Sequence, residues 1–350
     1  MSTTAFGTAI AQARDLLRWR SPLRTELWAA RLAAGLDPDE VEPFLRELAE
    51  DGGTEARLTL AALSVVNAAA DLSPSAGGGA PPHDGEDAGA TADRLVDAGI
   101  FVRAGHGVAE TLPGWVRRMG RVTCEGAWYG KADPFGEQTL AALSFRYENG
   151  KEPHLLVVAI DQVSGGLAVD AVVEEVKFLD DLDLRPEEPG AVAGRVLDAF
   201  ELGDRIMGAM VADTLSAVRP IALLRAQAIP GLVRPAPDDT VSRFRELPEL
   251  PGAREAFEKL VEFVGDRPLW WSPARVTQFL TSWLPREALL SESAIAAMPE
   301  VVRAWSRLSG AHAAVLAQVE ADAPRLPALM ADDSLAGLGK RIALAQRDQP

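Results

Sequence analysis

The segment His154–Phe178 constrains the fold of this chain more than any other stretch. Its first part, Leu155–Ile160, is apolar at every position, whereas a strand with one solvated face alternates apolar and polar residues. We therefore predict a strand that is buried on both faces. This strand ends at Asp161, and Gly165-Gly166 predicts a turn into a second apolar run that contains Asp170. The segment predicts the central hairpin of a small sheet.

The preceding sequence extends this hairpin into an antiparallel meander. Residues 121–131 and 139–147 have the composition of strands. Asp133-Pro134-Phe135-Gly136 predicts a turn between them, and Asn149-Gly150 predicts a tight hairpin before the next strand. His154 opens that next strand, and we expect it near a sheet edge.

Helices are predicted on both sides of the sheet by capping signals and by apolar spacing. Ser21-Pro22 and Asp37-Pro38 each combine a capping residue with a proline at the first helical position. The segment from residue 252 to 264 carries apolar residues at helical spacing. Because the two element types are segregated along the chain, the predicted class is α+β.

We predict four regions. They are an N-terminal helical bundle over residues 1–70, a flexible Gly- and Pro-rich linker or insertion over 71–90, an α+β region with the antiparallel sheet over 91–185, and a mainly helical half over 186–350 that packs on the sheet.

Composition excludes several classes of function. The formal net charge of −16 repels phosphates, so a general affinity for nucleic acid or for an anionic membrane is not expected. Cys124 is the one cysteine, which excludes an intrachain disulfide and a thiolate metal cluster. Arg14, Arg18 and Arg20 could form a local basic patch, although solvated helix faces explain them more simply.

The lengths of the apolar stretches indicate the cellular compartment to expect. None approaches the ~20 residues that a membrane span needs. The first basic residues follow the N-terminal apolar part, whereas a secretory signal places them before it. We therefore expect a cytoplasmic protein without a membrane segment.

Acidic residues on the central hairpin suggest a metal site as an alternative function. A two-residue turn at Gly165-Gly166 would place Asp161 directly opposite Asp170. This arrangement is destabilising unless the pair is solvated, one carboxylate is protonated, or a cation lies between the carboxylates. Asp133 and Glu137 could supply further oxygen ligands. This alternative requires a divalent metal such as Mg²⁺, whereas the leading hypothesis below requires no cofactor.

The tripeptide Glu175-Val176-Lys177 extends the alternative to catalysis. It resembles the acidic-x-lysine pattern of the PD-(D/E)xK nucleases, in which carboxylates hold Mg²⁺ and the lysine positions the attacking water. The candidate catalytic residues are then Asp161, Asp170, Glu175 and Lys177. A strand ending near Val173, followed by a turn or helix, would instead leave the acidic residues solvated.

The aromatic pair Trp270-Trp271 precedes a helix that Ser272-Pro273 is expected to start. Aromatic residues at helical spacing usually form core. If they do not, Trp270 and Trp271 are candidate anchors for a partner protein.

Three segments resemble an uncharacterised family of actinobacterial hypothetical proteins. They are SPLRTELWAARLAAG (21–35), the central block from GAWYGKADPFGEQTLAALSFRY (126–147) to VVAIDQVSGGLAVDAVV (157–173), and the segment starting WSPARVTQFLTSWLPREALL (271–290). The shared features are a DPYG-like turn and a VDxxxGGxxxD-like hairpin. The family has no assigned activity, so the resemblance implies no catalytic residue.

The leading hypothesis is a non-enzymatic cytoplasmic protein that binds another macromolecule, most simply a protein, through helical and acidic surfaces. It depends on the absence of a catalytic motif and on the abundance of amphipathic helices. The sequence leaves the oligomeric state open.

Overall fold

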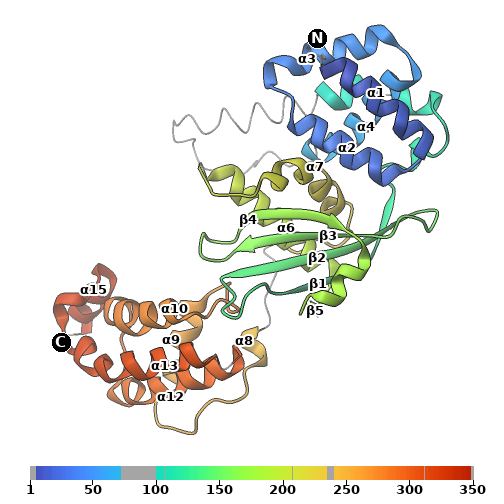
Figure 1. Ribbon diagram of the computed structural model, residues 1–350. Coiled ribbons are helices and arrows are strands. Elements are labelled where there is room, and N and C mark those ends of the chain that lie inside the picture. Colours follow the sequence, from blue (N-terminus) through green and yellow to red (C-terminus); the bar gives the residue numbers. More distant parts are fainter. Residues whose placement is uncertain are drawn as a thin grey trace. The chain divides into compact units, whose positions relative to one another are not determined.

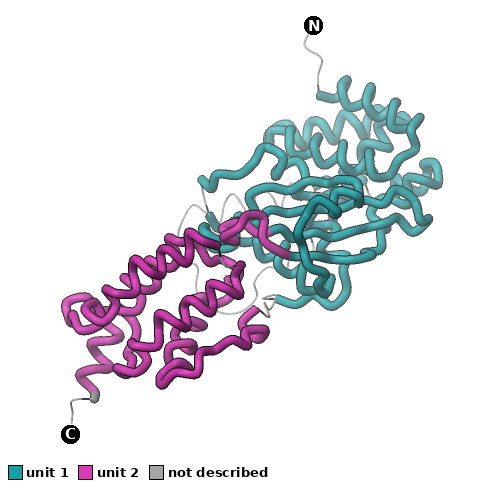
Figure 2. Tube along the Cα trace, turned by 60° about the horizontal axis from the view of Figure 1, so that its bottom comes forward, with its two compact units in different colours: residues 1–129, 140–236 teal, residues 130–139, 237–350 magenta. Residues whose placement is uncertain are grey.

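The computed structural model describes residues 5–71, 100–105, 107–206, 208–234, 240–310 and 312–347. The contacts divide the chain into two compact units (Figure 2): unit 1 comprises residues 1–129 and 140–236, and unit 2 comprises residues 130–139 and 237–350. Helices flank one antiparallel sheet, which confirms the predicted α+β class (Figure 1). The expected linker at 71–90 lies outside the described residues from residue 72 onward.

Unit 1 begins with a helical bundle, as predicted. Its four helices are α1 (Ala5–Trp19), α2 (Pro22–Ala34), α3 (Pro38–Asp51) and α4 (Thr54–Asp71). The first three each pack against α4. The predicted cap of α2 is present, because Ser21 Oγ accepts a hydrogen bond from the Arg24 amide at 3.1 Å. Short 3₁₀ turns, η1 (Val108–Thr111) and η2 (Val116–Arg118), then lead into the sheet.

The sheet is a meander with strand order β4-β3-β2-β1-β5. The strands are β1 (Val122–Lys131), β2 (Gln138–Tyr147), β3 (His154–Asp161), β4 (Leu167–Glu174) and the short β5 (Arg185–Pro186). Strand β3 lies inside the sheet, and Leu155 and Leu156 are fully buried. The prediction of a central strand covered on both faces is therefore confirmed.

Both faces of the sheet are covered within unit 1. On one face, Leu155 and Val157 pack with leucines that follow β4 in and after η3 (Val176–Asp181). The helices α6 (Pro189–Arg205) and α7 (Asp213–Gln227) pack against β4.

The pairing of β3 with β4 contains a β-bulge. Ala159 pairs with Asp170, but Ile160 pairs with Ala168, so Val169 is an extra residue on β4. The carbonyl of Val169 accepts a hydrogen bond from the Ala212 amide at 2.8 Å. The bulge thus serves the connection between α6 and α7, and it shifts every pair nearer the turn by one residue.

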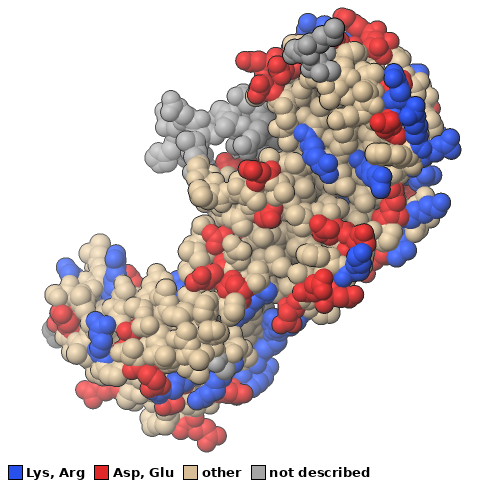
Figure 3. Space-filling view, viewed as in Figure 1, with Lys and Arg blue, Asp and Glu red and all other residues tan. Residues whose placement is uncertain are grey.

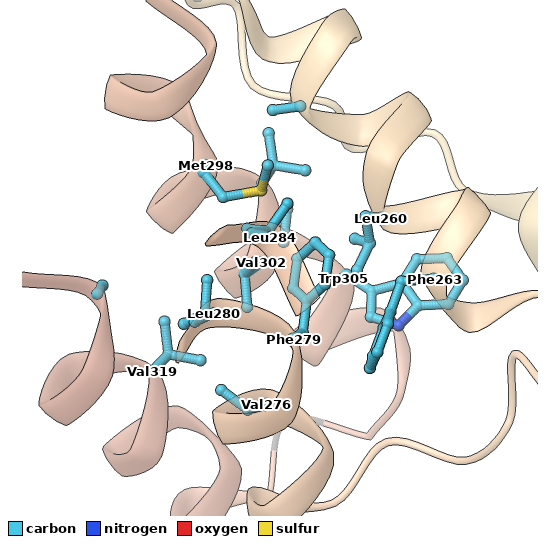
Figure 4. Close-up of a cluster of buried hydrophobic side chains, with 14 of the residues drawn as sticks. Leu260, Phe263, Val276, Phe279, Leu280, Leu284, Met298, Val302, Trp305 and Val319 are labelled. Atoms are coloured by element: carbon cyan, nitrogen blue, oxygen red, sulfur yellow. The ribbon is translucent and has the colours of Figure 1, made fainter. Parts of the chain in front are cut away.

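Unit 2 is helical apart from the loop that it takes from the β1–β2 hairpin. Its elements are α8 (Thr240–Arg243), α9 (Ala253–Val264), α10 (Pro273–Thr277), the π-helical η4 (Gln278–Trp283), α11 (Leu284–Glu287), α12 (Glu292–Leu308), α13 (Ala313–Asp322), η5 (Ala323–Arg325), α14 (Leu326–Ala331), η6 (Asp333–Leu335) and α15 (Leu338–Arg347). Its core is rich in aromatic side chains (Figure 4). The predicted cap at Ser272 is present, since its Oγ accepts from the Arg275 amide at 3.3 Å.

The turn predicted at Asp133–Gly136 belongs to unit 2. Phe135 packs against the core of unit 2, and its carbonyl accepts a hydrogen bond from the Trp271 amide at 2.8 Å. Lys131 Nζ donates to the Ser309 carbonyl at 2.6 Å. The sequence placed a boundary at residue 185, whereas the contacts assign α6 and α7 to the sheet unit and this hairpin end to the helical unit.

Candidate functional site

Asp161 caps the loop that follows β3. Its two carboxylate oxygens accept hydrogen bonds from the amides of Val163 and Ser164, each at 3.2 Å. Asp161 pairs with Leu167, so the loop contains five residues, 162–166. The predicted two-residue turn at Gly165-Gly166, with Asp161 opposite Asp170, is therefore wrong.

Asp170 contacts α7 instead of a second carboxylate. It pairs with Ala159 because of the bulge at Val169. Its Oδ1 accepts from its neighbouring amide at 2.7 Å and from the hydroxyl of Thr214, the second residue of α7. Asp170 therefore ties the start of α7 to the sheet.

Glu175 and Lys177 form an ion pair on the surface. Strand β4 ends at Glu174, and Glu175 occupies the position before η3. This agrees with the prediction of a strand that ends near Val173 and is followed by a turn or helix. Lys177 Nζ lies 2.8 Å from Glu175 Oε2, and both side chains are exposed. The hydrogen bond that Lys177 donates to this glutamate, together with the negative charge of the carboxylate, raises the pKa of Lys177.

The register separates this pair from Asp161. Glu174 pairs with Leu155, which lies six residues before Asp161 on β3. At ~3.3 Å per residue this is about 20 Å. The proposed set Asp161, Glu175 and Lys177 therefore does not share one metal ion.

Asp133 stabilises its own turn. Its oxygens accept from the amides of Phe135 at 2.7 Å, Glu137 at 3.3 Å and Gln138 at 2.6 Å. Asp133, Asp161 and Asp170 thus each bind backbone amides. Within the residues described by the structure, no group of three or more His, Cys, Asp or Glu side chains is placed to hold a metal ion.

The tryptophan pair lies in or against the core of unit 2. Trp271 is 1% exposed, and its Nε1 donates to Ser306 Oγ at 2.9 Å. The Trp270 ring is half-buried and has the Arg275 guanidinium 4.2 Å from its centroid. Trp271 is therefore a core residue, which agrees with the first interpretation of these aromatics and leaves its indole inaccessible to a partner, whereas Trp270 stays partly exposed.

Unit 1 buries an ion pair that local sequence patterns do not reveal. Arg225 on α7 donates to Glu26 on α2, and both side chains are fully buried. Arg225 also donates to the Tyr147 hydroxyl at 3.1 Å, while Glu26 accepts from the Gly120 amide at 2.6 Å. These residues connect the helical bundle, the sheet and α7.

His154 completes this buried network. Arg225 Nε donates to His154 Nε2 at 3.2 Å, so Nε2 carries no proton, and Nδ1 donates to the Glu152 carbonyl at 2.9 Å. Burial and then the Arg225 charge lower the pKa of His154 to about 4. The expected position near a sheet edge is wrong, because β3 is an interior strand and its first side chain is buried.

An open groove of about 390 Å³ lies between α1 and α2. Its lining is mainly apolar, and the residues are Gln12, Asp15, Leu16, Trp19, Arg24, Leu27, Trp28 and Arg31. Trp19 is 59% exposed, which is unusual for so large an apolar side chain. Trp28 is held by a hydrogen bond of 2.6 Å from its Nε1 to Gln12 Oε1. The groove therefore presents two indoles, one fixed and one exposed.

Two arginines, Arg24 and Arg31, line this groove. The Arg24 guanidinium lies 5.0 Å from the Trp19 ring centroid. Figure 3 shows basic side chains gathered over α1 and α2. The sequence offered two signals, the basic cluster Arg14, Arg18 and Arg20, and Arg31 at an otherwise apolar spacing; the exposure of Trp19 was missed. A tryptophan between two arginines at a helix end was the available clue.

No protein-family profile matches the chain, and no curated protein or solved structure matches it. None of the described helices is long and apolar enough to cross a membrane.

Proposed function

We propose that the protein is a non-enzymatic cytoplasmic protein that binds another protein, and that the α1–α2 groove is its docking site. The observation that carries this proposal is the exposed Trp19 beside an open, mainly apolar groove. Tryptophan and arginine dominate the binding energy of protein interfaces. Both residue types meet in this groove.

Hydrogen bonds within the bundle hold part of the groove in place, which favours binding. Trp28 is held by Gln12, and α2 begins at a fixed point because Ser21 caps it. Side chains that are already fixed lose little conformational entropy when a partner binds. By contrast, Asp133, Asp161 and Asp170 already bind backbone amides or α7, and Glu175 pairs with Lys177.

Site-specific photocrosslinking tests the proposal. A photoreactive residue replaces Arg31 at the groove, with Trp19 intact, and the full chain is expressed in its native host. We expect covalent adducts with a protein, and we expect Trp19→Ala to remove them. The same residue at position 46, an exposed arginine on α3, is the matched control. Adducts no stronger at position 31 than at position 46 would refute the docking site.

A further inference from the structure

We infer that the segment bound in the α1–α2 groove is an acidic amphipathic helix of the partner protein. This inference rests on the proposed function and specifies the chemistry of the partner. It follows from three features of the groove: its charge, the backbone of Arg20, and the arrangement of its apolar lining.

The groove lining carries Arg24 and Arg31 against one acid, Asp15, and the helices that form it have a charge opposite to that of the chain. Residues 5–36 contain five arginines and two acids, a net charge of +3, while the whole chain carries −16 and the remainder therefore −19. Arg14 pairs with Glu55 and Arg18 with Asp15, each at 3.3 Å.

Three further arginines, Arg20, Arg24 and Arg31, are exposed and have no carboxylate partner within the described residues. Arg24 and Arg31 line the groove, so it offers two uncompensated positive charges at its rim, and Arg20 directly follows the lining residue Trp19. Complementary carboxylates on a partner would supply both steering and specificity.

Arg20 occupies a backbone conformation that favours glycine. Its φ is 54°, and its amide donates to the Leu16 carbonyl at 2.9 Å, which ends α1. Glycine adopts this conformation without the steric cost that a side chain carries. An arginine at this position costs stability, and contact of its guanidinium with a partner would explain why the cost is tolerated.

The lining suits a helix more than an extended chain. Leu16 and Trp19 come from α1, and Leu27 and Trp28 from α2, so the apolar strip is bordered by two helices. An amphipathic helix fills such a groove with side chains at positions i, i+3, i+4 and i+7. Acidic residues beside this apolar face would then meet Arg24 and Arg31 at the rim.

A nucleic acid fits these observations less well. Single strands also bind through aromatic rings and arginines, but they present one phosphate per nucleotide along their whole length. Beyond residues 5–36 the chain carries −19, which would repel such a strand. A short acidic helix places its charge only at the groove.

Defined peptides test the inference with the full chain. The probe is a fluorescent peptide of about 14 residues, four helical turns, with leucine at the i, i+3, i+4 and i+7 positions and glutamate at the others. Three comparison probes keep the length: one replaces glutamate by glutamine, one by lysine, and one scrambles the acidic sequence. An oligothymidine of similar length is the fourth. Fluorescence anisotropy gives each Kd.

We expect the acidic amphipathic peptide to bind at least tenfold more tightly than every other probe. Arg24→Ala and Arg31→Ala should each weaken it about threefold, as single rim charges do, and Arg24→Glu by tenfold or more. Arg20→Gly should also weaken binding while the unfolding midpoint stays equal or rises. The control Arg46→Ala should change neither quantity.

Two results would overturn the inference. Equal binding of the glutamine peptide would show that charge plays no part, and tighter binding of oligothymidine would identify the groove as a nucleic-acid site. If adducts form at position 31 but no acidic peptide binds, the partner is a protein of other chemistry, so the proposed function survives and the inference does not. If no adducts form, both fail.

Discussion

The interior of unit 1 and the interior of unit 2 are stabilised by different chemistry. Unit 1 joins its bundle to its sheet through a buried network in which Arg225 contacts Glu26, Tyr147 and His154. Unit 2 uses aromatic packing, with the Trp271 and Trp305 rings nearly perpendicular at 85° and 6.5 Å apart. Its buried indoles and phenyl rings fill the space between α9, η4 and α12 (Figure 4). Unit 1 therefore adds a buried ionic network to its hydrophobic core, whereas the core of unit 2 is distinguished by its packed aromatic rings.

This difference predicts different responses to substitution. Each bond in a buried ionic network needs its partner, because an unpaired buried charge is far more costly than the pair is stabilising. Aromatic contacts are less directional, so the cost of a substitution follows the volume and area removed. Unit 1 should therefore lose stability when one partner of the network is removed and regain most of it when both partners are replaced. In unit 2, no second substitution should restore the stability that the first one removes.

The largest expected effect is that of Glu26→Ala. It leaves Arg225 charged and buried, and it removes the acceptor of the Gly120 amide. We expect a loss of about 5 kcal/mol in the free energy of unfolding of unit 1. Urea titration gives the loss, and hydrogen exchange resolved by peptide assigns it to one unit.

Its matched control is the double substitution Glu26→Leu with Arg225→Met. Removing both charges avoids the unpaired ion, so most of the lost stability should return. If the double variant were as unstable as Glu26→Ala, packing at these positions rather than charge would explain the loss.

Trp305→Ala is the corresponding test in unit 2. Trp305 is fully buried and contacts the rings of Phe244, Phe257 and Trp271. We expect a loss of about 4 kcal/mol, with faster hydrogen exchange in α9 and α12. Trp305→Phe should lose clearly less, because it keeps most of the apolar contacts. Equal losses for the two variants would indicate that the indole edge, and not its volume, matters.

Local signals predicted the elements but not the contacts between them. Ser21-Pro22, Ser272-Pro273 and Asn149-Gly150 act through neighbouring residues, so the sequence identified helix starts and a hairpin correctly. The pairing of Glu26 with Arg225 joins residues 199 positions apart, and no local period encodes it.

The predicted metal site on the central hairpin was wrong for a related reason. Asp161 pairs with Leu167 because the loop contains five residues and not two, and the position of Asp170 is then shifted by one extra residue, Val169, whose carbonyl accepts a hydrogen bond from the Ala212 amide. That contact comes from a connection between two later helices. A count of residues around Gly165-Gly166 therefore gives the wrong register, and with it the wrong carboxylate pair.

The third prediction concerns the pH dependence of stability, which should differ between the two units. The pKa of His154 is about 4 in the folded chain, against 6.5 for an unperturbed histidine. Because folding favours the neutral ring, the stabilisation is complete above pH 6.5 and is lost as the pH falls towards 4. The loss should approach about 3 kcal/mol in unit 1.

The groups that face His154 give this prediction its physical cause. Protonation of Nε2 would place a second cation 3.2 Å from Arg225 Nε, while the Glu152 carbonyl remains bound to Nδ1. Tyr147 and Phe145 provide the surrounding rings. His154→Gln keeps an acceptor for Arg225 and does not titrate. Its stability should therefore fall less than that of the unmodified chain between pH 6.5 and 4, and parallel curves would refute the prediction.

A smaller effect is expected from Trp271→Phe. The substitution removes the hydrogen bond of 2.9 Å to Ser306 Oγ while keeping an aromatic ring in the core. We expect a loss of about 1 to 2 kcal/mol, which combines one buried hydrogen bond with a small reduction in volume. The Ser306 hydroxyl keeps its hydrogen bond of 2.7 Å to the Val302 carbonyl, so adding Ser306→Ala removes only that bond and should cost little more, as measured by urea titration of the single and double variants.

The smallest effect on stability is expected from Trp19→Ala, although it removes the same side chain as Trp305→Ala. Trp19 is 59% exposed and contacts Arg24 across the groove, whereas Trp305 is fully buried. Surface substitutions change stability by about 0.5 kcal/mol or less, so the two variants should differ roughly eightfold in their effect. A loss above about 2 kcal/mol at Trp19 would place this indole in the core of unit 1 and would contradict its assignment to a docking surface. A negligible loss, together with the loss of photocrosslinks at position 31, would mean that the chain keeps this tryptophan for binding and not for folding.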